Sequence, residues 1–208
     1  QWTGSGNFAA IGSANLTNGK VTQFEVAGDF IFGFNGTEVV DYDATTVTKN
    51  RATIPLGFFA SFFHNYLFVA KTSAQPNRLH WSDLGTPTTF TGANFVDINP
   101  GDGDEIMGLG RLQDELFVFK KNTIWSITGW SGATFSTTTI ATQNTNARLL
   151  GYGCVSPQSI ISTGNDLYFM SFLSSVPVVR SLRKTINAVT LGGGVVSEDI
   201  KITLDGIN

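Results

Sequence analysis

The segment with the clearest capacity for chemistry is an acidic loop, "DINPGDGDE", at residues 97–105. Asp97 and Asn99 fall on the first and third positions of a calcium-binding loop, and Asp102 and Asp104 supply further carboxylates. The sixth position of such a loop must turn sharply and is normally Gly, yet Asp102 occupies it here. Pro-Gly and Asp-Gly, both present in the segment, are strong turn dipeptides. We therefore predict a turn between strands, with a cation bound at Asp102 and Asp104 as the alternative.

Nucleophilic catalysis requires a base beside the nucleophile, and the chain contains only two histidines, His64 and His80. Ser82 and Asp83 lie close to His80 in sequence, but neighbouring residues of a strand point to opposite faces, so adjacency builds no triad. The sequence has no Gly-Lys-Ser or Gly-Lys-Thr for a phosphate loop, and two histidines with one cysteine argue against structural zinc. We predict no catalytic residue, no cofactor-binding residue and no metal ligand.

Aromatic residues beside basic ones form the remaining candidate site. Trp81 follows Arg78, and Trp125 follows Lys121; such pairs stack on sugar rings or bases and neutralise charge. Packing between sheets, with the basic groups in water, is the competing interpretation. A carbohydrate- or receptor-binding module would need exposed tryptophans at equivalent places in several repeats, and Trp81, Trp125 and Trp130 are the candidates. A glycosidase would need two facing carboxylates, and no pair stands out among the 16 acidic residues.

The composition of the 208-residue chain predicts strands, which would have to position any such site. Charged residues make up 14% of the chain, against about 25% in an average soluble domain, while Gly and Phe number 23 and 17. A low charge content with many Thr, Ser, Gly and Phe residues favours strands and turns over surface helices. The net charge of −3 argues against a dedicated nucleic-acid-binding protein, which normally presents a basic face.

Two further features concern redox chemistry and membranes. Cys154 is the single cysteine, so it cannot form an internal disulfide, and we interpret it as a small buried residue. The most apolar stretch, residues 54–70, is interrupted by Pro55, His64 and Asn65 and is shorter than the roughly 20 apolar residues that span a bilayer. We predict that this stretch forms a strand, a turn and a second strand.

A short apolar segment recurs four times along the chain. The copies are "DFIFGF", "NYLFVA", "DELFVF" and "NDLYFM", beginning at Asp29, Asn65, Asp114 and Asn165. The third position is Leu or Ile and the fourth is aromatic in every copy. Each copy precedes an alternating run, as expected of a strand buried on both faces beside a strand with one wet face. Antiparallel meanders that repeat at roughly 40 to 50 residues are typical of propeller blades, and a β-sandwich is the alternative all-β fold.

Three longer blocks carry a series of motifs in a fixed order: "NRLHWSDLGTPTTFTG" at 77–92, "VDINPGDGDEIMGLGRLQDELFVFKKNTIWSITG" at 96–129 and "GYGCVSPQSIISTGNDLYFMS" at 151–171. In chain order the motifs are a Trp-Ser-Asp strand, a "PGDGD" corner, an "LFVFK" strand and a Gly-Cys-x-Ser-Pro entry to the next blade. In these motifs the chain resembles a propeller-type domain of structural virion proteins of tailed bacteriophages, of the tail nozzle and hub types. The resemblance implies that the acidic loop is a corner entering a blade strand.

The repeats and the resemblance together predict the organisation of the chain and its role. Residues 1–27 form a lead-in or partial blade, residues 28–190 contain propeller-like repeats starting near 29, 65, 114 and 165, and residues 191–208 connect to further chain. The resemblance implies a non-enzymatic tail protein of the virion, made in the host cytoplasm and assembled as a homo-oligomeric ring. Its expected partners are other tail proteins and, by passive contact, the DNA leaving the virion during ejection, with no membrane and no cofactor.

Overall fold

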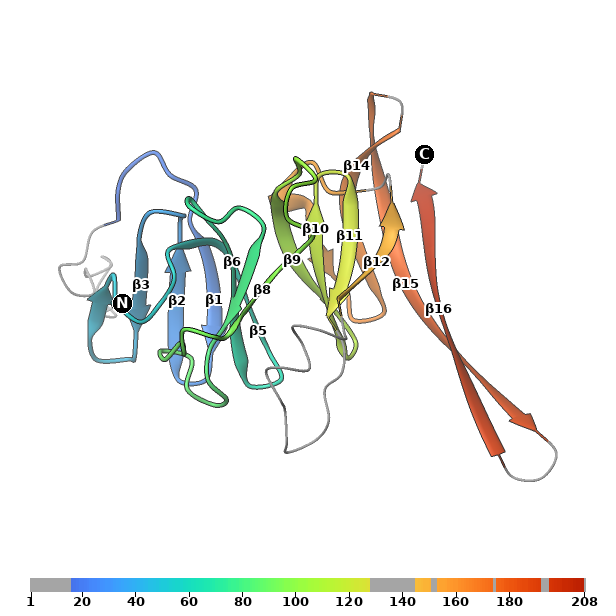
Figure 1. Ribbon diagram of the computed structural model, residues 1–208, viewed down its shortest axis with the longest axis horizontal. Coiled ribbons are helices and arrows are strands. Elements are labelled where there is room, and N and C mark those ends of the chain that lie inside the picture. Colours follow the sequence, from blue (N-terminus) through green and yellow to red (C-terminus); the bar gives the residue numbers. More distant parts are fainter. Residues whose placement is uncertain (1–15, 128–144, 151–152, 174, 192–194, 208) are drawn as a thin grey trace, which may run out of the picture. The chain divides into compact units, whose positions relative to one another are not determined.

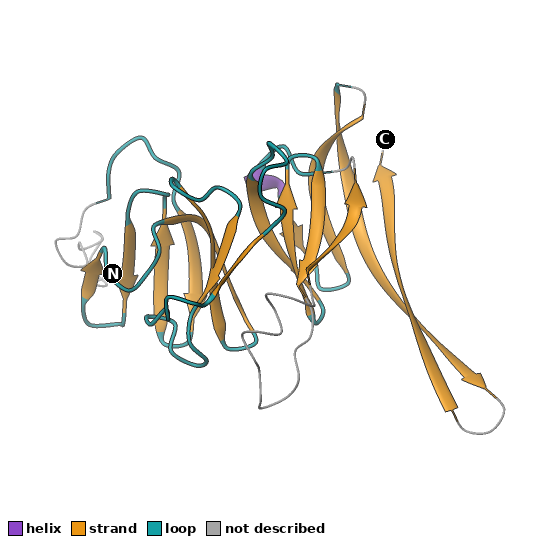
Figure 2. Cartoon of the chain, viewed as in Figure 1, coloured by secondary structure: helices purple, strands orange, loops and turns teal. Residues whose placement is uncertain are grey.

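The computed structural model describes residues 16–127, 145–150, 153–173, 175–191 and 195–207. Within these residues the chain is built from strands, with the short 3-10 turn η1 (Pro157–Ser159) as the single helical element (Figure 2). The strands form four antiparallel sheets of four strands each. The sheets belong to two compact units, residues 1–103 and 104–208, with two sheets in each. The prediction of an all-β protein is therefore confirmed.

In both sheets of the first unit the strands follow one another in chain order, each antiparallel to the one before (Figure 1). The first sheet consists of β1 (Gln23–Ala27), β2 (Phe30–Phe34), β3 (Val39–Tyr42) and β4 (Val47–Lys49). The second sheet consists of β5 (Gly57–Phe63), β6 (Tyr66–Thr72), β7 (Arg78–Trp81) and β8 (Phe95–Asp97). Antiparallel neighbours of this kind need only short connections, which Gly, Asn and Asp residues provide.

The apolar stretch at residues 54–70 divides into two strands at His64 and Asn65. Both residues have positive φ, 48° and 62°, which is the combination that a two-residue type I′ hairpin requires. The ring of His64 packs edge-on against Phe63, with ring centroids 4.2 Å apart. The prediction of a strand, a turn and a second strand is confirmed by β5 and β6.

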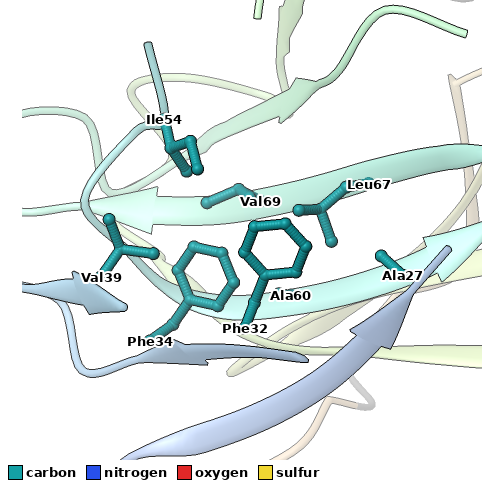
Figure 3. Packing of buried hydrophobic residues seen from close by; sticks show 8 residues of the cluster. All are labelled: Ala27, Phe32, Phe34, Val39, Ile54, Ala60, Leu67 and Val69. Carbon is teal, nitrogen blue, oxygen red and sulfur yellow. The ribbon is translucent and has the colours of Figure 1, made fainter. Parts of the chain in front are cut away.

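The two sheets of the first unit share a core to which their second strands contribute most of the large side chains (Figure 3). Phe32 and Phe34 of β2 face Leu67 and Val69 of β6, and all four side chains are fully buried. Burial of an aromatic or aliphatic side chain of this size contributes roughly 1.5–3 kcal/mol to folding. The alternation along β2 therefore fixes which face of the first sheet turns toward the second.

Side chains of β1 bond to the backbone of β5, which lies at an edge of its own sheet. The Gln23 side-chain amide donates to the Ala60 carbonyl oxygen (3.0 Å) and accepts from the Ala60 N–H (3.2 Å). Glu25 Oε1 accepts from the Phe62 N–H at 2.7 Å. An open strand edge is a template for pairing with another chain, so these bonds protect the edge within the unit.

The second unit has the same organisation. Its first sheet, the third of the chain, consists of β9 (Ile106–Leu112), β10 (Glu115–Lys120), β11 (Thr123–Ile127) and β12 (Thr145–Leu150). The last sheet consists of β13 (Ile161–Ser162), β14 (Asp166–Leu173), β15 (Val176–Leu191) and β16 (Val195–Ile207). The pairing of β14 with β15 ends at Arg183, and beyond this point β15 pairs with β16 alone as a two-stranded arm (Figure 1).

Within residues 191–208, which are predicted to connect to further chain, residues 195–207 form the strand β16. They pair with β15 through thirteen consecutive residue pairs, from Val179–Ile207 to Leu191–Val195. The physical reason is that the free edge of β15 offers an unpaired row of backbone donors and acceptors, which a following chain segment satisfies by adding a strand.

The core of the second unit brings the last sheet close to the backbone of β9. Phe119 of β10 and Phe169 of β14 are buried together, with ring centroids 5.0 Å apart. Gly108 and Gly110 of β9 permit this approach, since a Cβ built at Gly110 would lie 2.8 Å from Leu167 Cδ2. These two glycines interrupt any helical pattern in the sequence, and in the structure they also make room for the neighbouring sheet.

The four repeated segments occupy the same place in all four sheets. They form the second strands β2, β6, β10 and β14, and the alternating runs after them form the third strands β3, β7, β11 and β15. Each sheet begins one strand earlier than the predicted repeat, at β1, β5, β9 or β13. The first strands share no common residue pattern: β1 alternates, β9 contains two glycines and β13 has two residues.

Candidate functional site

Asp104, in the second half of the acidic loop, binds backbone rather than leaving its carboxylate open to solvent. Its side chain is buried, and its two oxygens accept from the N–H groups of Lys121 (3.0 Å) and Asn122 (2.7 Å). Both N–H groups belong to the turn between β10 and β11. The carboxylate therefore holds that turn in place, which is a structural role for the most buried acidic residue of the loop.

The first half of the acidic loop is a turn. Asn99 and Gly101 have positive φ, 43° and 88°, and Asn99 Nδ2 donates to Asp102 Oδ2 at 3.0 Å. Asp97 accepts from Arg78 through both carboxylate oxygens (2.7 and 2.9 Å), and this contact lowers the pKa of Asp97. The prediction of a turn is confirmed. In the part of the chain that the structure describes, no group of three or more His, Cys, Asp or Glu residues is placed to hold a metal ion.

His80 lies on β7 with its ring half-buried beside Phe95, at a centroid distance of 6.1 Å. Burial lowers the pKa of His80 to about 4, so its imidazole is neutral at pH 7. The Ser82 hydroxyl accepts from the Leu67 N–H (2.9 Å) and donates to the Asp83 carbonyl oxygen (3.0 Å). The backbone of the sheet therefore engages this hydroxyl, and the residues adjacent in sequence do not assemble a nucleophile with its base.

The tryptophans proposed for sugar stacking do not lie in equivalent environments. Trp81 is fully buried, as the packing interpretation of this residue predicts, and it does not present the exposed ring that a binding module would need. The alternation of β7 turns Leu79 and Trp81 into the interior. Trp125 is half-buried, and its Nε1–H donates to Thr123 Oγ1 at 3.1 Å. Trp130 lies outside the described residues.

The basic neighbours of these tryptophans also interact within the fold. The Arg78 guanidinium lies 3.7 Å from the ring centroid of Phe95 while it binds Asp97, so both its face and its edge are occupied. Lys121 has an exposed side chain on the turn that Asp104 holds. The Arg78 guanidinium is thus engaged within the first unit, whereas the Lys121 side chain lies in solvent.

Cys154 is a buried free cysteine in the core of the second unit, as predicted. Its Sγ donates to the Ser156 carbonyl oxygen at 3.1 Å. Burial raises the pKa of the thiol, so the group is protonated at neutral pH and lacks the thiolate that a nucleophile or metal ligand requires.

The first sheet turns one apolar face away from the second sheet. Gln23 and Glu25 of β1 bond toward β5, so the alternating residues Phe24 and Val26 point to the opposite side, where they are 63% and 64% exposed. Ile31 pairs with Val26 across the sheet and is 45% exposed. The cross-strand register adds half-buried side chains of β3 and defines the first outer face: Phe24, Val26, Ile31, Val40 and Tyr42.

The last sheet also turns an apolar face away from its neighbour within the second unit. Leu167 and Phe169 of β14 enter the core, so the alternating residues lie on the other side. Ile161, Phe172 and Val179 are 58%, 47% and 43% exposed there. The register of β13, β14 and β15 defines the last outer face: Ile161, Tyr168, Met170, Phe172 and Val179. Clusters of exposed apolar side chains mark interaction surfaces in soluble proteins.

Sequence reasoning missed both outer faces, although the residues of β1 carry a signal. Phe24 and Val26 alternate with Gln23 and Glu25, a pattern that normally places the apolar side chains in the core. In the structure the polar pair bonds to β5 and the apolar pair faces outward. This inversion depends on a strand that lies more than thirty residues away along the chain.

Comparison with known protein families finds no family that matches the chain, and comparison with curated proteins finds no match either. Of the helices that the described ranges contain, none has the length and apolar content needed to cross a membrane. The function of the chain is therefore inferred from its sheets, their sequence motifs and their exposed faces.

Proposed function

We propose that the chain is a structural protein of the virion of a tailed bacteriophage, a tail component of the nozzle or hub type, without catalytic activity. One observation carries the proposal. Four consecutive four-stranded meanders each use the same Leu/Ile-aromatic segment as their second strand, which is the repetition expected of propeller blades. The acidic loop, the segment best suited to chemistry, serves as a corner whose buried carboxylate holds a turn.

In this proposal each sheet is one blade of a β-propeller. The inner strands of neighbouring blades lie side by side around a common axis. Within the first unit β1 contacts β5, and within the second unit β9 contacts β13, and in both cases these are the first strands of successive sheets. Chain-order meanders of four strands favour blades over the two large facing sheets of a sandwich.

The role of such a protein in the tail is mechanical. Buried Phe and Leu side chains between sheets make each unit rigid, and bonded edges such as that of β5 limit uncontrolled pairing. Copies form a ring that contacts other tail proteins, consistent with a charged content of only 14%, because interface cores are depleted of charge. A net charge of −3 repels DNA weakly, so a duplex leaving through such a ring slides without binding.

The proposal is tested on purified virus particles. Mass spectrometry of particles that encode the chain should detect its peptides at a fixed ratio to the known tail proteins. Antibodies against the chain, coupled to gold, should label the tail in electron micrographs and leave the capsid unlabelled. The absence of the chain from purified particles would refute the proposal. On a glycan array the purified chain should show no sugar preference, whereas specific binding that Trp125→Ala abolishes would indicate a receptor-binding module instead.

A further inference from the structure

The packing of second strands follows the same rule in both units. In the repeated segment the third and fifth residues lie on one face of the sheet, and the fourth and sixth residues lie on the other. In the first unit Phe32 and Phe34, the fourth and sixth residues of the segment in β2, face Leu67 and Val69, the third and fifth residues of the segment in β6 (Figure 3). We call the face that carries the fourth and sixth residues of the segment the even face of a sheet, and the face that carries the third and fifth residues the odd face.

The second unit obeys the same rule with different side chains. Phe117 and Phe119, the fourth and sixth residues of the segment in β10, share a core with Leu167 and Phe169, the third and fifth residues in β14. An even face therefore packs on the odd face of the sheet that follows, in two independent instances. Both instances pair two phenylalanines with a leucine and a second apolar residue. The unpaired faces differ in residue type, with Tyr168 and Met170 at the even positions and Ile31 and Gly33 at the odd positions.

Within the first unit the rule gives the odd face of the first sheet no partner, and within the second unit it gives the even face of the last sheet none, among the described residues. The third residue of the segment is fully buried as Leu67, Leu116 and Leu167, whereas Ile31 is 45% exposed. The fourth residue is fully buried as Phe32, Phe68 and Phe117, whereas Tyr168 is only half-buried. The first outer face is therefore an odd face without an even partner, and the last outer face is an even face without an odd partner, among the residues that the structure describes.

We propose that the last outer face of one copy of the chain binds the first outer face of the next copy. The occupant of each face is thus a second copy of this chain, because that copy presents the complementary kind of face with the same strand order. Both faces present aliphatic and aromatic side chains. The last outer face has Tyr168 and Phe172 on either side of Met170. The first outer face has Phe24 and Val26 near Ile31.

This contact is heterologous, since each copy uses two different surfaces. A heterologous contact produces a closed ring if the rotation between copies closes, and an open filament if it does not. The inference rests on the blade-like packing of the proposed function and specifies the surfaces through which its ring would assemble. It concerns the purified chain alone, so its failure would leave the test on virus particles intact.

The experiment uses one charge-introducing variant on each face. Val26→Lys alters the first outer face and Val179→Lys the last, at positions 64% and 43% exposed, so both variants should keep the fold. Leu84→Lys, at an exposed apolar residue outside both faces, is the matched control. Sedimentation velocity of the full chain measures the assembly state, and circular dichroism verifies the fold.

The expected pattern is specific to a head-to-tail contact. The unaltered chain and Leu84→Lys should form oligomers, while Val26→Lys and Val179→Lys should each sediment as monomers, with association weakened roughly tenfold or more. An equimolar mixture of the two monomeric variants should form a dimer, because one intact face of each kind is then available. A monomeric unaltered chain, a single variant that still dimerises, or a mixture that stays monomeric would each overturn the proposal. Ile31→Lys and Phe172→Lys repeat the test if either first variant fails to fold.

Discussion

Replacing Asp104 with alanine distinguishes a structural carboxylate from a cation ligand. The substitution removes two hydrogen bonds from the Lys121 and Asn122 N–H groups to a buried, charged acceptor. Hydrogen bonds to charged groups contribute about 1.5–3 kcal/mol each. Lys121 and Asn122 are exposed, so water can bind their N–H groups in the variant and the loss should lie at the lower end. We expect Asp104→Ala to lower the free energy of unfolding by about 2–3 kcal/mol.

The change should be measurable both globally and locally. In a chain of this size a loss of that magnitude corresponds to a fall in the midpoint of thermal unfolding of about 4–12 °C. Hydrogen exchange of the peptide covering residues 115–127 should show faster exchange at the β10–β11 turn. Asp104→Asn retains one acceptor oxygen and should lose about half as much stability. Asp102→Ala, on the exposed part of the same loop, should change stability by less than about 0.5 kcal/mol.

Two results would refute this reasoning. The first is an Asp104→Ala variant whose unfolding midpoint and exchange rates match those of the unaltered chain. The second is a rise in the unfolding midpoint of the unaltered chain on addition of calcium that disappears in Asp104→Ala, since such a rise shows that the carboxylate binds a cation in the folded state.

Three further predictions concern the cores and the response to pH. Phe34→Ala should lower the free energy of unfolding by roughly 3–5 kcal/mol in urea titrations, because Phe34 lies in the core. Phe24→Ala, on the first outer face, should lower it by less than about 1 kcal/mol in the monomer. Equal effects of the two substitutions would contradict the assignment of faces. Gly110→Ala should destabilise the second unit by roughly 1–3 kcal/mol because its Cβ meets Leu167, while Gly92→Ala, with nothing within 4 Å, should be neutral; a neutral Gly110→Ala would show that Leu167 moves freely. The pKa of His80 is about 4 in the folded chain, against 6.5 for an unperturbed histidine. As the pH falls below 6.5, His80 therefore becomes protonated in the unfolded chain before it does in the folded chain, and the free energy of unfolding should decline between pH 6.5 and pH 4. His80→Gln should flatten the urea midpoint between pH 7 and pH 5, and an unchanged slope would mean that other groups carry it.

Several features of the fold follow from local residue patterns. The segments at β6 and β10 are continuously apolar and become strands whose residues are buried on both faces, as predicted. The alternating run at β7 becomes a strand with alternating burial, and the acidic loop becomes a turn. These outcomes depend on period-two geometry and on the φ angles that Gly and Asn tolerate, both of which operate over a few residues.

Other features depend on contacts between residues far apart in the chain. The sequence left stacking open as an alternative for Trp81, and the register of β7 buries its ring. It left a cation open as an alternative for Asp104, and the two carboxylate oxygens instead accept from a turn 17 and 18 residues later. Residues 195–207 alternate apolar and polar side chains at Ile200, Ile202 and Leu204, but their pairing depends on the edge that β15 provides.

Residue patterns are enough to predict short antiparallel strands, the places of the second and third strand of each sheet, and the turn in the acidic loop. The side of each strand that is covered depends on how the sheets pack. In the first sheet the polar side of β1 bonds inward to β5 and the apolar side is left outside. Alternation specifies that a strand has two different faces, but which face is buried depends on the sheet that packs against it, and that sheet comes from a distant part of the chain.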